Sequence, residues 1–146
     1  MFFAHCDILC SGTDHLIKGV LKIMKLFLLL GSISAFLFVA IGAFGAHALK
    51  AKLEAGGYVE TFNTGVQYHM IHSIAIIGVA LLTQHLNSTG LLYGAGWAFV
   101  IGIIIFSGSL YALSITGMSI LGAITPIGGL AFLTGWVLLF IAALNL

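Results

Sequence analysis

Charge is what this sequence has least of. Its 146 residues include five lysines, no arginine and four acidic residues, so charged residues make up only 6% of the chain. A soluble domain carries about 25% charged residues, and a nucleic-acid-binding surface needs clustered lysine and arginine. The composition therefore excludes an ordinary water-soluble domain and gives no basis for a nucleic-acid partner.

The few charges are also confined to one end of the chain. Residues 61–146 contain no Asp, Glu, Lys or Arg, and hydrophobic residues make up 61% of the whole. Neither a Ser-His-Asp triad nor a pair of catalytic carboxylates can be assembled from apolar segments that contain no carboxylate. We therefore expect a protein that is not an enzyme and that needs no cofactor.

Four apolar runs are long enough to cross a bilayer, which takes about 20 residues. They cover residues 26–46, 64–83, 91–113 and 126–143. Each run is continuously apolar, unlike the alternating strands of a membrane barrel. Thr125 before Pro126 suggests a helix start, because Thr caps free amides and Pro fits the first helical position. The sequence predicts an all-α, four-helix transmembrane bundle.

Two stretches around the first run have another character. Residues 49–63 hold both glutamates and the Gly56-Gly57 pair, which is typical of a short interfacial helix followed by a turn. The first run also has features of a secretory signal peptide, since lysines precede it and the small residues of 43–46 end it. Its length favours retention as a membrane helix.

Residues 1–23 contain no membrane-like run and hold both cysteines. We interpret them as a disordered leader or as the result of a mis-assigned start, with Met24 as the natural first residue. The membrane domain is then 24–146. Three lysines precede the first run and two follow it, a bias that favours a cytoplasmic amino terminus.

Polar residues gather at one side of the predicted bundle. Helices alternate in direction, so the end of the first, the start of the second, the end of the third and the start of the fourth share a side. Polar side chains in hydrocarbon are expected to turn inward and find partners. The predicted polar cluster comprises His47, Tyr68, His69, His72, Ser107, Ser109, Tyr111 and Thr125.

This cluster has three interpretations. Its members can hydrogen-bond across helices while small residues allow close packing, the commonest use of such residues in membranes. They can instead line a path for a proton or a small neutral solute. His69 and His72 share a helix face and, with His47, can form a metal or haem site, but zinc needs three or four ligands, so we expect no metal. The expected packing residues are Gly42, Gly45, Gly108, Pro126, Gly128 and Gly129.

Four motifs carry a family resemblance. They are Gly42-Ala43-Phe44-Gly45-Ala46-His47, Thr64-Gly65-x-x-Tyr68-x-x-x-His72, Phe106-Ser107-Gly108-Ser109-Leu110-Tyr111 and Thr125-Pro126-x-Gly128-Gly129-x-x-Phe132-Leu133-x-Gly135-Trp136. In this order they resemble the small integral membrane proteins of the domain of unknown function 423, to which the eukaryotic transmembrane protein 256 is related.

The resemblance covers residues 24–146 and implies a four-helix protein, in bacteria one of the cytoplasmic membrane. It implies no reaction. Because the loops are short, we expect a non-enzymatic scaffold or an accessory subunit that contacts the lipid bilayer and a membrane protein partner or a second copy. The alternatives are a transporter or pore and a histidine-ligated metal or haem protein.

Overall fold

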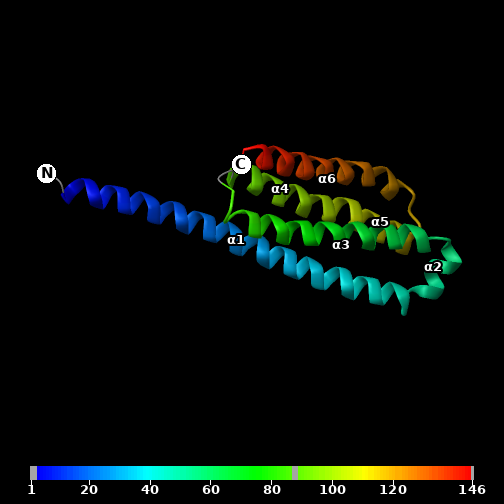
Figure 1. Ribbon diagram of the computed structural model, residues 1–146. Coiled ribbons are helices and arrows are strands. Elements are labelled where there is room, and N and C mark those ends of the chain that lie inside the picture. The colour runs from blue at the N-terminus through cyan, green and yellow to red at the C-terminus, as the bar shows by residue number, and fades with distance from the viewer. Residues whose placement is uncertain (1–2, 87–88, 146) are drawn as a thin grey trace.

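The chain folds into long helices that run alternately in opposite directions (Figure 1). The computed structural model describes residues 3–86 and 89–145. Its elements are α1 (Phe3–Ala46), α2 (Lys50–Gly56), α3 (Val59–Leu82), α4 (Thr89–Gly102), the π-helical turn η1 (Ile103–Ser107), α5 (Gly108–Thr116) and α6 (Ile120–Leu144). Within these residues, four segments are long and apolar enough to cross a membrane, namely Ile17–Ala46, Val59–Leu82, Thr89–Thr116 and Ile120–Leu144. The predicted all-α bundle of four spans is confirmed.

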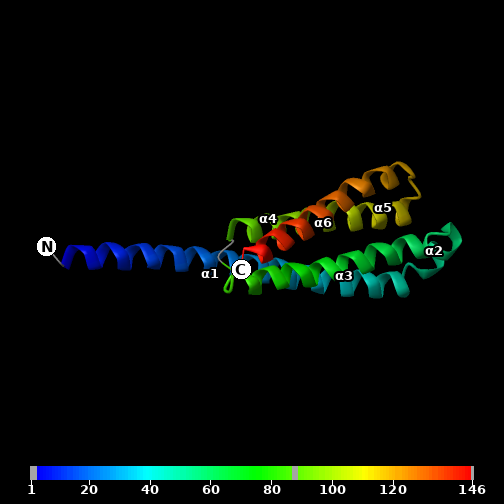
Figure 2. The same ribbon diagram turned by 45° about the horizontal axis from the view of Figure 1, so that its top comes forward.

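The bundle consists of two helix pairs. Helix α1 packs along α3, and α4 packs along α6; the pairs meet where α3 lies against α4, η1 and α5. Figure 2 shows the pairs close together near the carboxyl terminus of α6 and diverging toward the end that carries α2. The polar side chains described below lie at the contacts between these helices.

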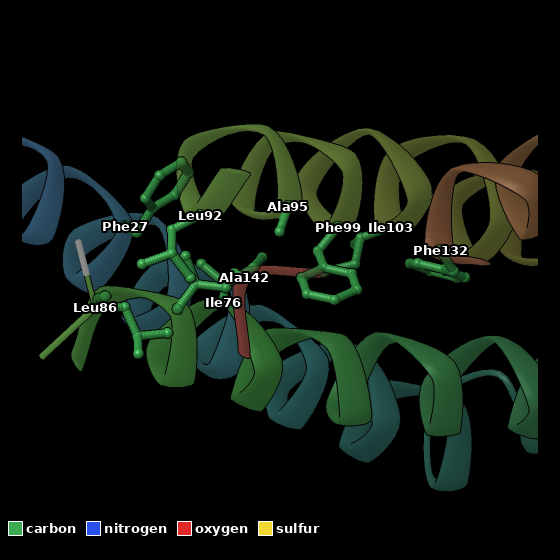
Figure 3. Close-up of a cluster of buried hydrophobic side chains, with 11 residues drawn as sticks. Phe27, Ile76, Leu86, Leu92, Ala95, Phe99, Ile103, Phe132 and Ala142 are labelled. Carbon is green, nitrogen blue, oxygen red and sulfur yellow. The ribbon is translucent and has the colours of Figure 1, made fainter. Parts of the chain in front are cut away.

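The buried core contains the rings of Phe27, Phe99 and Phe132 among aliphatic side chains (Figure 3). Phe27 of α1 is fully buried against Gly96 of α4, where a Cβ would come within 2.4 Å of its ring. Phe132 of α6 occupies the corresponding space at Gly102. The abundant glycines therefore let whole rings fit between helices, since interiors are close-packed.

Helix α1 extends well beyond the predicted first span. Residues 1–23 are expected to be a leader outside the membrane domain, whereas the structure continues α1 back to Phe3, as a segment that projects past the bundle (Figure 1). A helix already nucleated over 26–46 propagates at low cost, because each added residue completes one hydrogen bond. That Met24 is the natural start remains a prediction, and residues 1–2 lie outside the described part.

The fourth helix begins earlier than predicted. It starts at Ile120, so Pro126 lies inside α6 and Thr125 does not cap it. Proline removes the hydrogen bond to the carbonyl four residues before it, here that of Gly122. Membrane helices tolerate this loss, and the residues before Thr125 are apolar enough to continue the helix. The prediction placed the start at a proline that interrupts the helix without ending it.

The connection between α1 and α3 contains the short helix that the sequence predicts. Helix α2 ends at Gly56 and is followed by Gly57, whose φ of 71° is the left-handed conformation that favours glycine. On its exposed face, the Lys50 Nζ atom lies 3.9 Å from the Glu54 Oε1 atom. The second span begins at Val59, five residues before the predicted start, and therefore includes Glu60 and Asn63.

Candidate functional site

The predicted polar cluster is divided among three separate interhelical contacts. His69 and His72 lie three residues apart on α3, yet His69 bonds to α1 and α5 while His72 bonds to α6. The third contact joins α5 to α6 through Ser109 and Thr125.

The His69 network consists of Ser34, His69, Ser73 and Tyr111. His69 is buried, with its Nε2 atom 3.0 Å from Ser34 Oγ of α1 and its Nδ1 atom 3.2 Å from the Tyr111 hydroxyl of α5. Ser34 Oγ also lies 2.7 Å from Ser73 Oγ, and Ser73 donates to the His69 carbonyl at 2.7 Å. Four side chains therefore connect three helices.

The donors of this network are arranged in one direction. Because Ser73 gives its only proton to a carbonyl, its oxygen accepts from Ser34. Ser34 then accepts from Nε2–H of His69, which leaves Nδ1 to accept from Tyr111. In this arrangement every hydroxyl and imidazole proton has an acceptor. In the reverse direction, the Tyr111 proton has no acceptor among the described residues, so the forward arrangement is favoured.

The His72 network is fixed in the same way. His72 Nδ1 lies 2.7 Å from the Tyr68 carbonyl, and Trp136 Nε1 of α6 donates to His72 Nε2 at 3.2 Å. A carbonyl only accepts and an indole N–H only donates. His72 is therefore the neutral tautomer that carries its proton on Nδ1, the opposite of His69.

Aromatic rings enclose His72. The imidazole is 3% exposed and stacks on Phe132, with ring centroids 3.5 Å apart and planes 8° from parallel. Tyr68 contributes its carbonyl and its ring, which lies 4.6 Å from Phe106, while its side chain is 41% exposed. Tyr68 therefore contributes to this network through its carbonyl and its ring, and its hydroxyl makes no hydrogen bond to any of the described residues.

Ser109 and Thr125 form the third contact. Their hydroxyl oxygens are 2.9 Å apart, and each hydroxyl also lies near a carbonyl of its own helix, at 2.9 Å for Phe106 and 3.3 Å for Leu121. The two side chains connect α5 to α6 just before Pro126. Thr125, which the sequence placed both in the polar cluster and at a helix cap, thus makes an interhelical contact and does not cap α6.

Two predicted members stand apart from these contacts. His47 is exposed after the end of α1 and is not brought to the other histidines. Ser107, at the end of η1, is fully buried, and its hydroxyl has no partner among the described residues. Since His69 and His72 also point to different helices and use both ring nitrogens in bonds to protein groups, the three candidate metal ligands do not converge.

The predicted packing residues differ in how closely they approach a neighbour. An added Cβ at Gly128 would lie 2.4 Å from the backbone nitrogen of Phe106, and one at Gly45 would enter the ring of Phe62. At Gly129 the nearest atom is 3.8 Å away, and at Gly42 it is 3.3 Å away. Gly108 has open space around it, and Pro126 is exposed.

Two grooves border the networks. One of about 410 Å³ lies between α1 and the η1–α5 segment, with Ser34, His69 and Tyr111 among its lining residues. The other, of about 650 Å³, lies between α3 and α6 and is lined by aromatic side chains that include His72 and Trp136. Both histidines thus lie at the edge of an otherwise apolar groove.

Three residues of the networks are not among the residues of the predicted polar cluster, namely Ser34 of α1, Ser73 of α3 and Trp136 of α6. Ser73 lies four residues after His69, a spacing that places both on one face and could have found it. Ser34 has no such signal, because its partner lies 35 residues away.

Four apolar helices joined by short connections, with buried polar groups bonded between the helices, define a small multi-pass integral membrane protein. Residues 41–129 match the family described as "Protein of unknown function (DUF423)". The chain belongs to this family, as its resemblance to the domain of unknown function 423 suggested.

Curated relatives support the same assignment. The UPF0382 membrane protein YwdK of Bacillus subtilis is 50% identical over 122 residues, which are 84% of this chain and 98% of the relative. The UPF0382 membrane protein SH2409 of Staphylococcus haemolyticus is 46% identical over 82% of this chain and 95% of its own length. The UPF0382 inner membrane protein YgdD of Escherichia coli is 37% identical over 84% of this chain and 92% of its own length. No solved structure matches the chain.

Proposed function

We propose that this chain is a non-enzymatic scaffold or accessory subunit of the bacterial cytoplasmic membrane. Its buried polar side chains hold four helices in a fixed arrangement that presents lipid-exposed surfaces to other membrane proteins. The name of YgdD, an inner membrane protein, supports the location. The role of the buried polar residues is decisive, because any transport or redox activity within the membrane would need these groups.

One observation carries the proposal. The His69 and His72 networks use the protons of their own hydroxyl, imidazole and indole groups in bonds to protein acceptors. A solute path needs donors and acceptors that are free to bind what passes. Side chains that already satisfy one another act instead as interhelical contacts.

The small surface outside the membrane supports the same function. The connection between α3 and α4 spans only residues 83–88, and that between α5 and α6 only residues 117–119. Helix α2 adds seven residues. Such connections leave little room for a catalytic site in water, so the helices themselves provide the surface available to a partner.

Flux measurements in proteoliposomes test the proposal against a transport function. We expect the proton permeability of liposomes containing the purified chain to equal that of empty liposomes. Tyr111→Phe and His69→Leu should leave this value unchanged, as should the control Thr134→Val, whose hydroxyl bonds only to its own helix. A proton flux that the first two variants abolish and the control retains would refute the scaffold proposal in favour of a path.

A partner search completes the test. The tagged chain is purified from native membranes in mild detergent, and the proteins that accompany it are identified by mass spectrometry. A scaffold or accessory subunit should carry the same membrane protein in stoichiometric amount in repeated purifications. Recovery of the chain with no stoichiometric companion, including no second copy, would contradict the proposal.

A further inference from the structure

The outer face of α3 carries the amide side chain of Gln67 within the apolar span, and that of Asn63 nearer the helix start, beside a pocket that Lys50 and Glu54 also line. Asn63 and Gln67 are exposed, and neither makes a hydrogen bond to any of the described residues. The midpoint of α3 falls between Met70 and Ile71, so Gln67 lies about 5 Å and Asn63 about 11 Å from it along the axis. Both distances are below the hydrocarbon half-thickness of about 15 Å.

An unbonded amide in hydrocarbon is costly, so it is expected to find a partner. Two threonine hydroxyl groups at the outer surface bond within their own helices: that of exposed Thr134 donates to the Leu130 carbonyl at 2.8 Å, and that of half-buried Thr64 donates to the Glu60 carbonyl at 2.9 Å. The Gln67 amide has no such bond within its own helix. The partner must therefore come from outside the described residues.

The surrounding residues form a stripe suited to a second helix. Exposed or half-buried residues of α3 recur at positions i, i+4, i+7, i+11, i+15 and i+18. At 3.6 residues per turn these positions lie within a sector of about 80° around the helix axis. The members of this α3 stripe are Asn63, Gln67, Met70, Ile74, Gly78 and Leu81. A Cβ at Gly78 would meet nothing within 4 Å, so this small residue leaves room for close approach.

We propose that a second copy of this chain docks on the α3 stripe and forms a parallel dimer. All copies share one orientation in the membrane, so the two-fold axis runs along the membrane normal and each residue near it meets its own counterpart. An amide both donates and accepts, so Gln67 pairs with Gln67 of the second copy without any other chemistry. Asn63 has the same property one turn away.

The outer face of α6 does not offer this match. The outer face of α6 is apolar, with Leu133 62% exposed and Phe140 65% exposed, and its exposed Thr134 is already bonded. Such side chains are as well solvated by lipid tails as by a second helix. The interface does not depend on the His69 and His72 networks, so it goes beyond the proposed function and its test is separate.

Disulfide cross-linking in native membranes tests the interface. Cys6 and Cys10 are replaced by serine, and single cysteines are introduced as Met70→Cys or Ile74→Cys, which keep Gln67. We expect oxidation to give a product of twice the chain mass at both positions, and little product from Leu133→Cys or Phe140→Cys. Equal yields on α3 and α6, or an adduct of another mass at position 70 or 74, would overturn the proposal.

The amide itself is tested by dimer affinity in liposomes, measured by energy transfer between labelled copies. Two amide hydrogen bonds of average membrane strength correspond to a roughly eightfold weaker dimer in Gln67→Leu. Thr134→Val is the matched control and should not change the affinity. Because Gln67 is exposed, the monomer should stay folded, which circular dichroism checks. A dimer unaffected by Gln67→Leu would exclude Gln67 as the contact.

Discussion

His69 and His72 are three residues apart on one helix, yet their partners fix opposite tautomers. His69 donates through Nε2 and accepts through Nδ1, whereas His72 donates through Nδ1 to a carbonyl 2.7 Å away and accepts from Trp136. In nitrogen-15 spectra of histidine-labelled protein in bilayers, the signals assigned to His69 and His72, two of the six histidines, should therefore come from neutral rings of opposite tautomers. Trp136→Phe should alter only the His72 signals. Two rings of the same tautomer would contradict the hydrogen-bond directions.

The one-way order of the His69 network predicts unequal effects of two substitutions. Tyr111→Phe removes the first donor and leaves only the Nδ1 acceptor of His69 unpaired. Ser34→Ala removes two bonds at once and leaves the Nε2–H donor of His69 buried without an acceptor. We expect losses in the free energy of unfolding of about 0.5–1 kcal/mol and about 1–3 kcal/mol, respectively.

Reversible unfolding in mixed micelles measures both losses. The control Thr134→Val removes a hydroxyl that is exposed and bonded to its own helix, so it should change the stability by less than about 0.5 kcal/mol. If Tyr111→Phe proved costlier than Ser34→Ala, the donors would run in the opposite direction.

For the polar residues of the networks, the sequence predicts burial better than it predicts hydrogen-bond partners. His69, His72 and Ser109 were expected to face inward, and they do, at 4%, 3% and 7% exposure. That His69 and His72 face different helices could not be predicted. The two side chains point in somewhat different directions from α3, and their partners depend on which helices pack on each side of it. Ser34 was missed because the alternating direction of the helices groups only residues near helix ends. Ser34 lies well inside α1.

At the scale of the helix, neighbouring glycines of α6 provide a matched comparison. A Cβ at Gly128 would lie 2.4 Å from the Phe106 nitrogen and 2.7 Å from its Cα atom, so α6 must move away from η1. A Cβ at Gly129 meets only the edge of the Phe106 ring at 3.8 Å, an ordinary contact. Gly128→Ala should therefore destabilise the protein by about 1–3 kcal/mol or more, while Gly129→Ala should be neutral or slightly stabilising.

The same unfolding measurement in micelles checks this pair. Both substitutions add one methyl group to one helix, so differences in insertion or helix propensity cancel between them. Similar stabilities for the two variants would show that α6 does not cross η1 at Gly128.

The sequence pattern predicts the helices better than it predicts their boundaries and local irregularities. Continuous apolar runs predicted the four helices, because hydrocarbon requires backbone groups to bond within each helix. Their ends were less certain: Pro126 lies inside α6, and η1 interrupts the third span with a π-helical turn. Neither is visible in the sequence, since a membrane helix can lose one backbone bond or insert one residue while the apolar pattern continues.

At the scale of the whole molecule, two helix pairs meet along α3 and leave a groove on each side of that contact. The polar networks lie at the borders of these grooves, where they connect helices that would otherwise touch little. This arrangement explains why so few polar residues suffice: each one joins two or three helices. The sequence predicted the number of helices and their polarity, but their pairing follows from the rings that fit onto particular glycines.

The orientation that we expect for the molecule in the membrane depends on very few charges, which makes it testable. Lys18, Lys22 and Lys25 lie on one side, and Lys50 and Lys52 on the other, so a bias of three to two favours an amino terminus in the cytoplasm. With four spans the carboxyl terminus shares that side. A fluorescent protein fused there should fluoresce, and alkaline phosphatase fused there should be inactive.

Replacing charges should shift this result in a defined direction. Lys18→Gln with Lys22→Gln changes the bias to one against two, so we expect a mixture of orientations and measurable phosphatase activity. Lys50→Gln with Lys52→Gln changes it to three against none and should keep the phosphatase inactive. Since both variants lose two lysines, a difference between them reports position rather than net charge. An active phosphatase on the unmodified chain would mean that these lysines do not set the orientation.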